Sequence, residues 1–144
     1  MVLLQECTYK NTEAYVPEIK ECKIVKCYDG DTVTIAIVID NKGYRFSVRM
    51  LGYDCAEIRS KDEQEKKVAK WAKEYITSMI YDKVVTVVQN DGYDKYGRLL
   101  LKLEINGINI NDVMLEKWGV SYFGGHKEKI DWSLWDESGR GVPV

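Results

Sequence analysis

The sequence predicts a mainly β fold with some α, in which five strands form a closed Greek-key barrel. Five short runs rich in Val, Ile, Thr and Leu are bounded by turn-forming residues such as Asp, Asn and Gly. Two other segments carry apolar residues at helical spacing, one between the third and fourth strands and a short one after the fifth. This order of elements is that of an OB-fold barrel.

Composition limits the kinds of protein that this chain can be. Its 144 residues fit one domain with one core. The 21 basic and 23 acidic residues leave a net charge of -2, so a polyanion must be held by a local cationic pocket. No apolar run is long enough to cross a bilayer, and the N-terminus lacks the pattern of a secretory signal. We therefore expect an intracellular protein with no membrane partner, and a monomer.

Cysteine and histidine usage argues against a zinc site. The four cysteines form no C-x-x-C pair and are too sparse for a disulfide-stapled scaffold, so we expect reduced thiols. With a single histidine, His126, the usual zinc ligand sets cannot be assembled. The carboxylates favour instead a hard cation bound through oxygen.

Three parts of unequal length are expected along the chain. Residues 1–21 are polar and aperiodic, with Pro17 as a breaker, and we expect them to form an arm lying over the domain. Residues 22–124 contain all the predicted strands and helices and form the OB-fold domain. Residues 125–144 contain Gly and Trp without periodicity, and we expect an irregular C-terminal tail.

Turn residues separate the predicted strands. Asp29-Gly30 is a tight-turn signal between the first two strands, and a second turn is expected at residues 41–43. In the third strand apolar and polar residues alternate, which places Arg49 on the polar face, and Arg98 begins the fifth strand in the same way. The expected strands are residues 23–28, 32–40, 44–51, 83–89 and 98–105.

Two helices are expected. Ser60-Lys61-Asp62-Glu63 fits a capping box, so the first helix should begin there, and its apolar periodicity ends near Tyr81. The second should run from about residue 109 to 118 and stop at Gly119.

Charged clusters stand at the ends of the predicted strands. Asp29-Gly30-Asp31-Thr32 is either a hairpin turn with solvated carboxylates or a cation site with Asp31 as a ligand. Asp54 and Glu57 are either a solvated acidic loop before a helix or two carboxylates that address one ion or its water. Arg49 beside them requires a salt bridge or an anionic ligand.

The third cluster is Asp94-Lys95-Tyr96-Gly97-Arg98, which read alone is a turn. If the fold brings the clusters together, Arg49 and Arg98 can grip one phosphate, because a guanidinium donates two parallel hydrogen bonds. Three acids against two arginines and a divalent ion leave about one surplus positive charge, which suits a phosphodiester that gains negative charge as water attacks. The hypothesis requires these five side chains to converge around one ion.

In this order the motifs resemble those of the staphylococcal nuclease family over about residues 22–124. They are DGDT, the R-x-x-x-x-D-x-x-E pattern that begins at Arg49, the DKYGR loop and a second helix that contains Asn111. The resemblance implies an OB-fold endonuclease that uses Ca²⁺ to hydrolyse DNA and RNA, single-stranded or locally unpaired, and leaves 3′-phosphate ends. The alternative is a catalytically silent OB-fold module that binds nucleic acid or protein.

The resemblance also implies roles for individual residues. The implied calcium ligands are Asp31, Asp54 and the backbone carbonyl of Cys55. Glu57 is similar to the residue that orients or deprotonates the attacking water. The implied phosphate-binding pair is Arg49 and Arg98, and the implied substrate contacts are Lys95, Tyr96 and Tyr122. Cys55-Ala56 departs from the family's Thr-Pro pair, and the sequence after Trp118 departs from its third helix.

Overall fold

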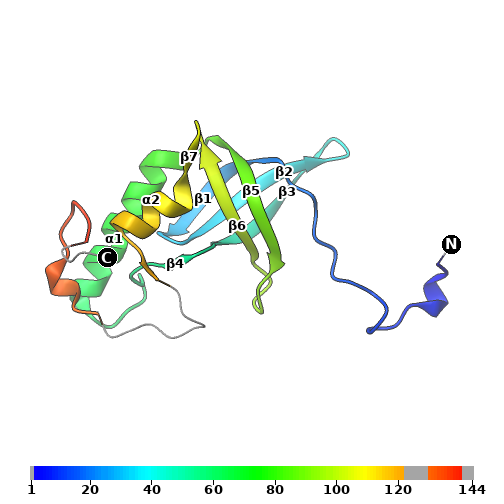
Figure 1. The fold of residues 1–144 in the computed structure, drawn as a ribbon, viewed down its shortest axis with the longest axis horizontal. Coiled ribbons are helices and arrows are strands. Elements are labelled where there is room, and N and C mark those ends of the chain that lie inside the picture. The colour runs from blue at the N-terminus through cyan, green and yellow to red at the C-terminus, as the bar shows by residue number, and fades with distance from the viewer. Residues whose placement is uncertain (1, 122–129, 141–144) are drawn as a thin grey trace.

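The computed structural model describes residues 2–121 and 130–140, and it shows a closed barrel of five strands with two helices (Figure 1). Its main sheet has the strand order β3-β2-β1-β5-β6-β7, and a parallel pairing of β3 with β6 closes the barrel. The barrel strands are β1 (Glu21–Asp29), β2 (Thr32–Ile39), β3 (Lys42–Met50), β5 (Val84–Tyr93) and β6 (Leu99–Ile105). The predicted OB-fold barrel is confirmed.

Short elements complete the fold. They are η1 (Leu4–Glu6), β4 (Tyr53–Asp54), β7 (Ile108–Asn109), β8 (Val120–Ser121) and η2 (Trp132–Leu134). β4 pairs with β8 in a separate two-stranded sheet, which lies beside the second helix. Within the described residues, neither helix combines the length and apolarity that a bilayer span needs.

The turn between β2 and β3 lies one residue earlier than the sequence pattern predicts. Asp40 and Asn41 both have positive φ, 49° and 67°, as a two-residue hairpin turn requires. Their short polar side chains tolerate this left-handed conformation. β3 therefore starts at Lys42 and pairs with β2 along its whole length, and this register sets Arg49 opposite Thr32.

The first helix, α1 (Glu63–Ile80), begins with a different cap from the one predicted. Asp62 is the N-cap, and its carboxylate accepts hydrogen bonds from the backbone N–H groups of Gln64 and Glu65. The prediction that Ser60 caps the helix was wrong: its hydroxyl donates to the Glu65 carboxylate at 2.8 Å instead. A carboxylate at the N-cap also brings negative charge to the positive end of the helix dipole. The helix ends where predicted.

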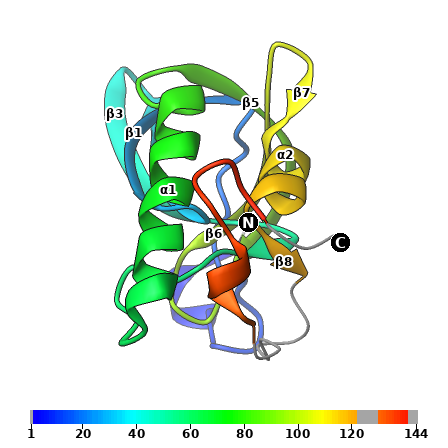
Figure 2. The same ribbon diagram turned by 90° about the vertical axis from the view of Figure 1, so that its left-hand side faces the viewer.

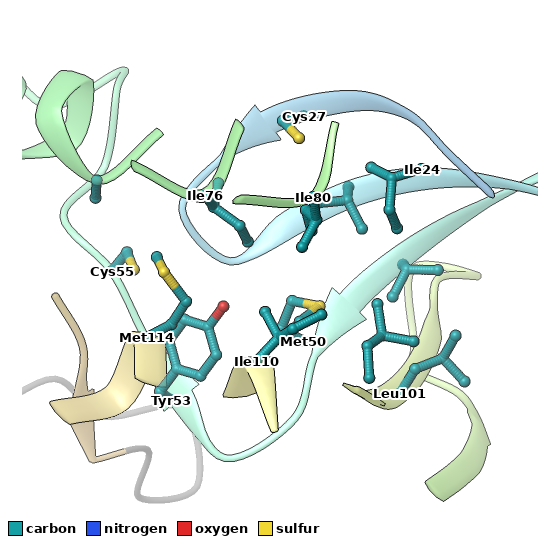
Figure 3. Close-up of a cluster of buried hydrophobic side chains, with 14 of the residues drawn as sticks. Ile24, Cys27, Met50, Tyr53, Cys55, Ile76, Ile80, Leu101, Ile110 and Met114 are labelled. Carbon is teal, nitrogen blue, oxygen red and sulfur yellow. The ribbon is translucent and has the colours of Figure 1, made fainter. Parts of the chain in front are cut away.

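The core lies between the barrel and the two helices (Figure 3). In β6, Leu99, Leu101 and Leu103 are fully buried and form one apolar face, as alternation along a strand requires. Along α1, buried residues recur every four positions and so form one stripe against the barrel. That stripe consists of Val68, Ala72, Ile76 and Ile80.

Asn111 is a buried polar residue that joins three elements. It lies in the second helix, α2 (Ile110–Lys117), with 2% of its surface exposed. Its side chain accepts from the N–H of Leu103 at 2.9 Å, and donates to the carbonyls of Leu51 and Leu101 at 2.9 and 3.0 Å. These bonds fix α2 against β6 and against the turn that follows β3.

The described part of the C-terminal segment, residues 130–140, packs against both helices (Figure 2). Trp132 and Trp135 are buried, with 6% and 3% of their surface exposed. Arg140 donates from its backbone N–H to the Lys117 carbonyl at 2.9 Å, and from its guanidinium to the Leu115 carbonyl at 3.1 Å. The guanidinium thus lies at the C-terminal end of α2, where the helix dipole favours positive charge.

The N-terminal arm does not lie over the domain as expected. Residues 2–16 are exposed and extend away from the barrel (Figure 1). Only the end of the arm is anchored, where Ile19 is buried and the Lys20 carbonyl accepts from the N–H of Val87 at 2.9 Å. Cys7 on the arm is exposed, whereas Cys22, Cys27 and Cys55 are buried.

Gly30, in the turn between β1 and β2, is required by close packing. A Cβ at this position would lie 2.7 Å from the Cys55 sulfur and 3.0 Å from the Ala72 Cβ. The turn therefore rests directly on the loop after β4 and on α1. This contact fixes the position of Asp31, the next residue.

We predict that Gly30→Ala destabilises the fold by about 1–3 kcal/mol, because the added methyl group overpacks this contact. Urea unfolding measures the change. Gly43→Ala is the matched control, since a Cβ there meets nothing within 4 Å. Equal stability of the two variants would contradict the packing argument.

Candidate active site

A cleft of about 970 Å³ lies where the β1–β2 turn, the end of β3, the loop after β4 and the β5–β6 loop meet. All three charged clusters of the sequence line it. Its charged residues are Asp29, Asp31, Arg49, Asp54, Glu57, Arg59, Asp94, Lys95 and Arg98. The barrel explains this convergence: Arg49 pairs with Thr32 across the β2–β3 ladder and with Leu100 across the parallel β3–β6 ladder.

Arg49 is at the centre of the site. Its guanidinium forms an ion pair with Asp54 and a second with Asp31, whose carboxylate oxygen lies 3.4 Å away. It also donates to the carbonyls of Tyr53 and Met50 at 3.0 and 3.2 Å. The three charged side chains are only 10–14% exposed. Loss of the arginine would leave two buried carboxylates without their cation, which is strongly unfavourable.

Asp31 is held by several donors. The Thr32 hydroxyl donates to one carboxylate oxygen at 3.0 Å, and the N–H of Cys55 donates to the other at 2.9 Å. Burial acts to raise the pKa of Asp31, but the hydrogen bond from Asp29, the charge of Arg49 and the Cys55 N–H outweigh it and lower that pKa. Asp31 is therefore ionised at neutral pH.

Asp29 is the carboxyl group of this pair with the higher pKa. Burial, together with the hydrogen bond to Asp31 and the charge of Asp31, raises the pKa of Asp29 to about 7. One of its oxygens also accepts from the backbone N–H of Asp31 at 3.2 Å. Two carboxyl groups so close favour one shared proton, as like charges at short range cannot both ionise without cost. In its protonated form, Asp29 donates a hydrogen bond to the Asp31 carboxylate.

Glu57 lines the same cleft on the loop after β4. Cys55 and Ala56, which precede it, are buried, whereas Glu57 itself is exposed and its backbone N–H donates to the Glu65 carboxylate at 2.8 Å. In the described ranges, no three Asp, Glu, His or Cys side chains gather closely enough to hold one ion, so the expected gathering of three acids around one ion is not seen there. Asp31 and Asp54 share the Arg49 guanidinium.

The β5–β6 loop presents Arg98 to the cleft. The Asp94 carboxylate accepts from the N–H groups of Tyr96 and Arg98 at 2.8 and 3.0 Å, and from the Arg98 side chain at 2.8 Å. Lys95 and Arg98 lie over the Tyr96 ring, 5.2 and 5.3 Å from its centre. The two arginines thus line one cleft but are held by different acids. Tyr122, the third predicted substrate contact, lies outside the described residues.

The charges of the cleft suit a hard divalent cation. Its five carboxyl groups and four cationic side chains leave one surplus negative charge when all are ionised, and a divalent ion would reverse that sign. Asp31 and Asp54 offer buried carboxylate oxygens around a single cationic group, and oxygen is the ligand that calcium takes. The donor chemistry therefore fits a calcium ion.

Comparison with known proteins gives the family. The model described as staphylococcal nuclease homologue matches residues 47–128, more than half of the chain. The chain belongs to the staphylococcal nuclease family. The matched range contains Arg49, Asp54, Glu57 and Arg98, and it begins after Asp31.

This family member is also similar to an uncharacterized protein of Bacillus anthracis. The two are 35% identical over 109 residues, which cover 71% of this chain and 49% of the relative. The chain thus spans about half the length of the curated relative that it matches. The family membership indicates a nuclease-like function.

Sequence reasoning missed several residues of the cleft. Arg59 follows Glu57 by two positions and adds an exposed cation to the lining, and Asp94 was seen as a turn former but not as the group that holds Arg98. Tyr28 lines the cleft beside Asp29. Each of these residues lies beside or within one of the predicted charged clusters in the sequence, and this was the one signal that could have found them.

The shared proton predicts a pH dependence of stability in the absence of divalent ions. Between the ordinary pKa of 3.8 and the raised value of about 7, folded Asp29 binds more protons than unfolded Asp29. The free energy of unfolding therefore falls as pH rises through this window. Urea unfolding with a chelator between pH 5 and 8 measures the slope.

We expect Asp29→Asn to remove this contribution, because an amide donates to Asp31 without titrating. Asp91→Asn is the control, since Asp91 is exposed and lies outside the cleft lining. An identical pH slope in wild type and Asp29→Asn would show that Asp29 does not hold the proton.

Proposed function

We propose that this member of the staphylococcal nuclease family is a calcium-dependent endonuclease that hydrolyses the phosphodiester bonds of DNA and RNA and leaves 3′-phosphate ends. The observation that carries the proposal is the Arg49 ion cluster with Asp31 and Asp54, in one cleft with Glu57 and Arg98. Such a set of carboxylates and guanidinium groups matches what phosphodiester hydrolysis requires.

Asp31, Asp54 and the backbone carbonyl of Cys55 are the residues that would hold calcium. When bound, the ion supplies positive charge that offsets the charge developing on the phosphate. Asp31 is prepared for this role, since its pKa is lowered even though burial opposes the lowering. Thr32 and the Cys55 N–H orient its two oxygens.

Glu57 is the group proposed to take the proton of the attacking water. Its exposed position in the cleft, where water can reach the carboxylate, suits a base. The water oxygen bonds to phosphorus, its proton passes to Glu57, and the phosphorus–O5′ bond breaks. The departing oxygen takes up a proton from solvent.

Arg98 and Arg49 are proposed to bind the phosphate. Arg98 enters the cleft with its Nε held by Asp94, which fixes the orientation of the guanidinium. Arginine contacts to a transferring phosphoryl group contribute about a thousandfold or more in rate. We further propose that the substrate is single-stranded or locally unpaired, and that the enzyme acts as a monomer.

Cleavage of a labelled single-stranded oligonucleotide, with calcium and with a chelator, tests the proposal. We predict calcium-dependent cleavage with 3′-phosphate products, and a loss of about a thousandfold or more for Arg98→Ala. Glu57→Gln should lose cleavage but keep oligonucleotide binding. Glu74→Gln is the control, because Glu74 is exposed on α1 and outside the cleft lining.

Folded protein that binds the oligonucleotide but never cleaves it, with calcium or any other divalent ion, would overturn the proposal. That result would favour the silent OB-fold binding module. Cleavage that persists unchanged in Glu57→Gln would instead contradict the role given to this glutamate.

A further inference from the structure

Tyr28 is an exposed aromatic residue on the wall of the cleft. It precedes Asp29 at the end of β1, and 41% of its surface is exposed. Two other tyrosines line the cleft, and both have structural contacts. Tyr53 is buried and its hydroxyl donates to the Gly30 carbonyl at 2.8 Å. Tyr96 is 72% exposed, and its ring has Lys95 and Arg98 over it, 5.2 and 5.3 Å from its centre.

The Tyr28 side chain has no such contact. Among residues 2–121 and 130–140, it makes no hydrogen bond, ring contact or cation–π contact. Charged side chains line much of the cleft, and the exposed ring offers an apolar surface among them. An exposed aromatic surface of this kind offers a flat face to a ligand that has a π system.

Tyr28 lies close to the acids of the cleft along the chain. It is in β1 at an irregularity of the β1–β2 ladder, between the pairs Cys27–Val33 and Asp29–Thr32, and three residues before Asp31. The residues that follow form the turn that packs against Cys55 and Ala72 at Gly30. Paired residues on both sides of Tyr28 therefore anchor the backbone that carries the ring.

We propose that Tyr28 stacks on an unpaired nucleobase of the bound strand, and so makes single-stranded nucleic acid the preferred substrate. This inference rests on the proposed function, because it assumes that a phosphodiester occupies the cleft. Every base has a π face, so stacking tolerates any sequence. In a duplex both faces of a base are covered by its neighbours, and the ring then has no partner.

Oligonucleotide binding by proteins that carry Glu57→Gln tests the inference without cleavage. Fluorescence anisotropy with a labelled ten-nucleotide single strand, in calcium, gives the dissociation constants. We predict that Tyr28→Ala weakens binding about five- to a hundredfold, the range that loss of one stacked base gives. Tyr28→Phe, which keeps the ring, should bind within about twofold of the parent.

Tyr44→Ala is the matched control. Tyr44 is a strand tyrosine of similar exposure, 43%, and it lies outside the cleft lining. Its loss should leave binding unchanged. Thermal unfolding of each variant shows whether the fold is kept, and the Phe variant separates loss of the ring from any effect of truncation on folding.

An abasic nucleotide moved through each position of the strand locates the contact. We predict one position at which the abasic strand binds the Tyr28 protein and the Tyr28→Ala protein equally well, because the stacking partner is missing on one side or the other. A blunt duplex should also bind both proteins equally. A Tyr28→Ala effect that is absent, or is as large for the duplex and for every abasic strand, would overturn the inference.

The outcome is separable from that of the proposed function. If cleavage needs calcium but Tyr28→Ala leaves oligonucleotide binding unchanged, the stacking inference alone is overturned. Binding that depends on Tyr28, without any cleavage by the protein that has Glu57, overturns the nuclease proposal alone. Failure to bind any oligonucleotide overturns both.

Discussion

The ion cluster of Arg49 with Asp31 and Asp54 is the constraint on which the rest of the cleft depends. It joins the β1–β2 turn, which carries Asp31, to the end of β3 and to β4. Buried carboxylates need a cation, and this requirement fixes the spacing between the β1–β2 turn and the loop after β4. The contact of Gly30 with Cys55 fixes the same spacing by packing.

The barrel sets the positions from which this cluster can form. The parallel pairing of β3 with β6 brings Arg49 beside Leu100, and so brings the loop that carries Arg98 to the same end of the barrel. Asn111 holds the turn after β3 against α2 with buried hydrogen bonds. Arg49 and Asp54 thus stand on strands, and the turn and loops that carry the other charged groups are joined to the same end of the barrel.

Local pattern predicted much of the fold, because strand alternation and helix periodicity are local signals. The apolar face of Leu99 to Leu103 and the position of Arg49 on its strand needed only the period of two. The N-cap of α1 was predicted at the wrong residue because Ser60 and Asp62 are both residue types that cap helices. The choice between them depends on the Glu65 carboxylate, which accepts a hydrogen bond from the Ser60 hydroxyl and leaves Asp62 as the cap. The packing of residues 130–140 against the two helices could not be predicted either, because that segment has no periodic pattern.

In the candidate site, too, the local motifs could be recognised in the sequence, whereas contacts between residues far apart in the chain could not. The sequence indicated which acids and arginines could meet in one site, but not that Arg49 forms ion pairs with both Asp31 and Asp54. Nor could it indicate that the pKa of Asp29 is raised, since that requires burial and a second carboxyl group in contact. Such properties arise from three-dimensional proximity.

The central claim, that Asp31 and Asp54 form the calcium site, is tested most directly by thermal unfolding with increasing calcium. A ligand that binds only the folded state raises the unfolding midpoint as its concentration exceeds the dissociation constant. The account predicts a calcium-dependent rise in the wild-type protein and none in Asp31→Asn or Asp54→Asn. A wild-type midpoint that ignores calcium, or an equal rise in all three proteins, would contradict it.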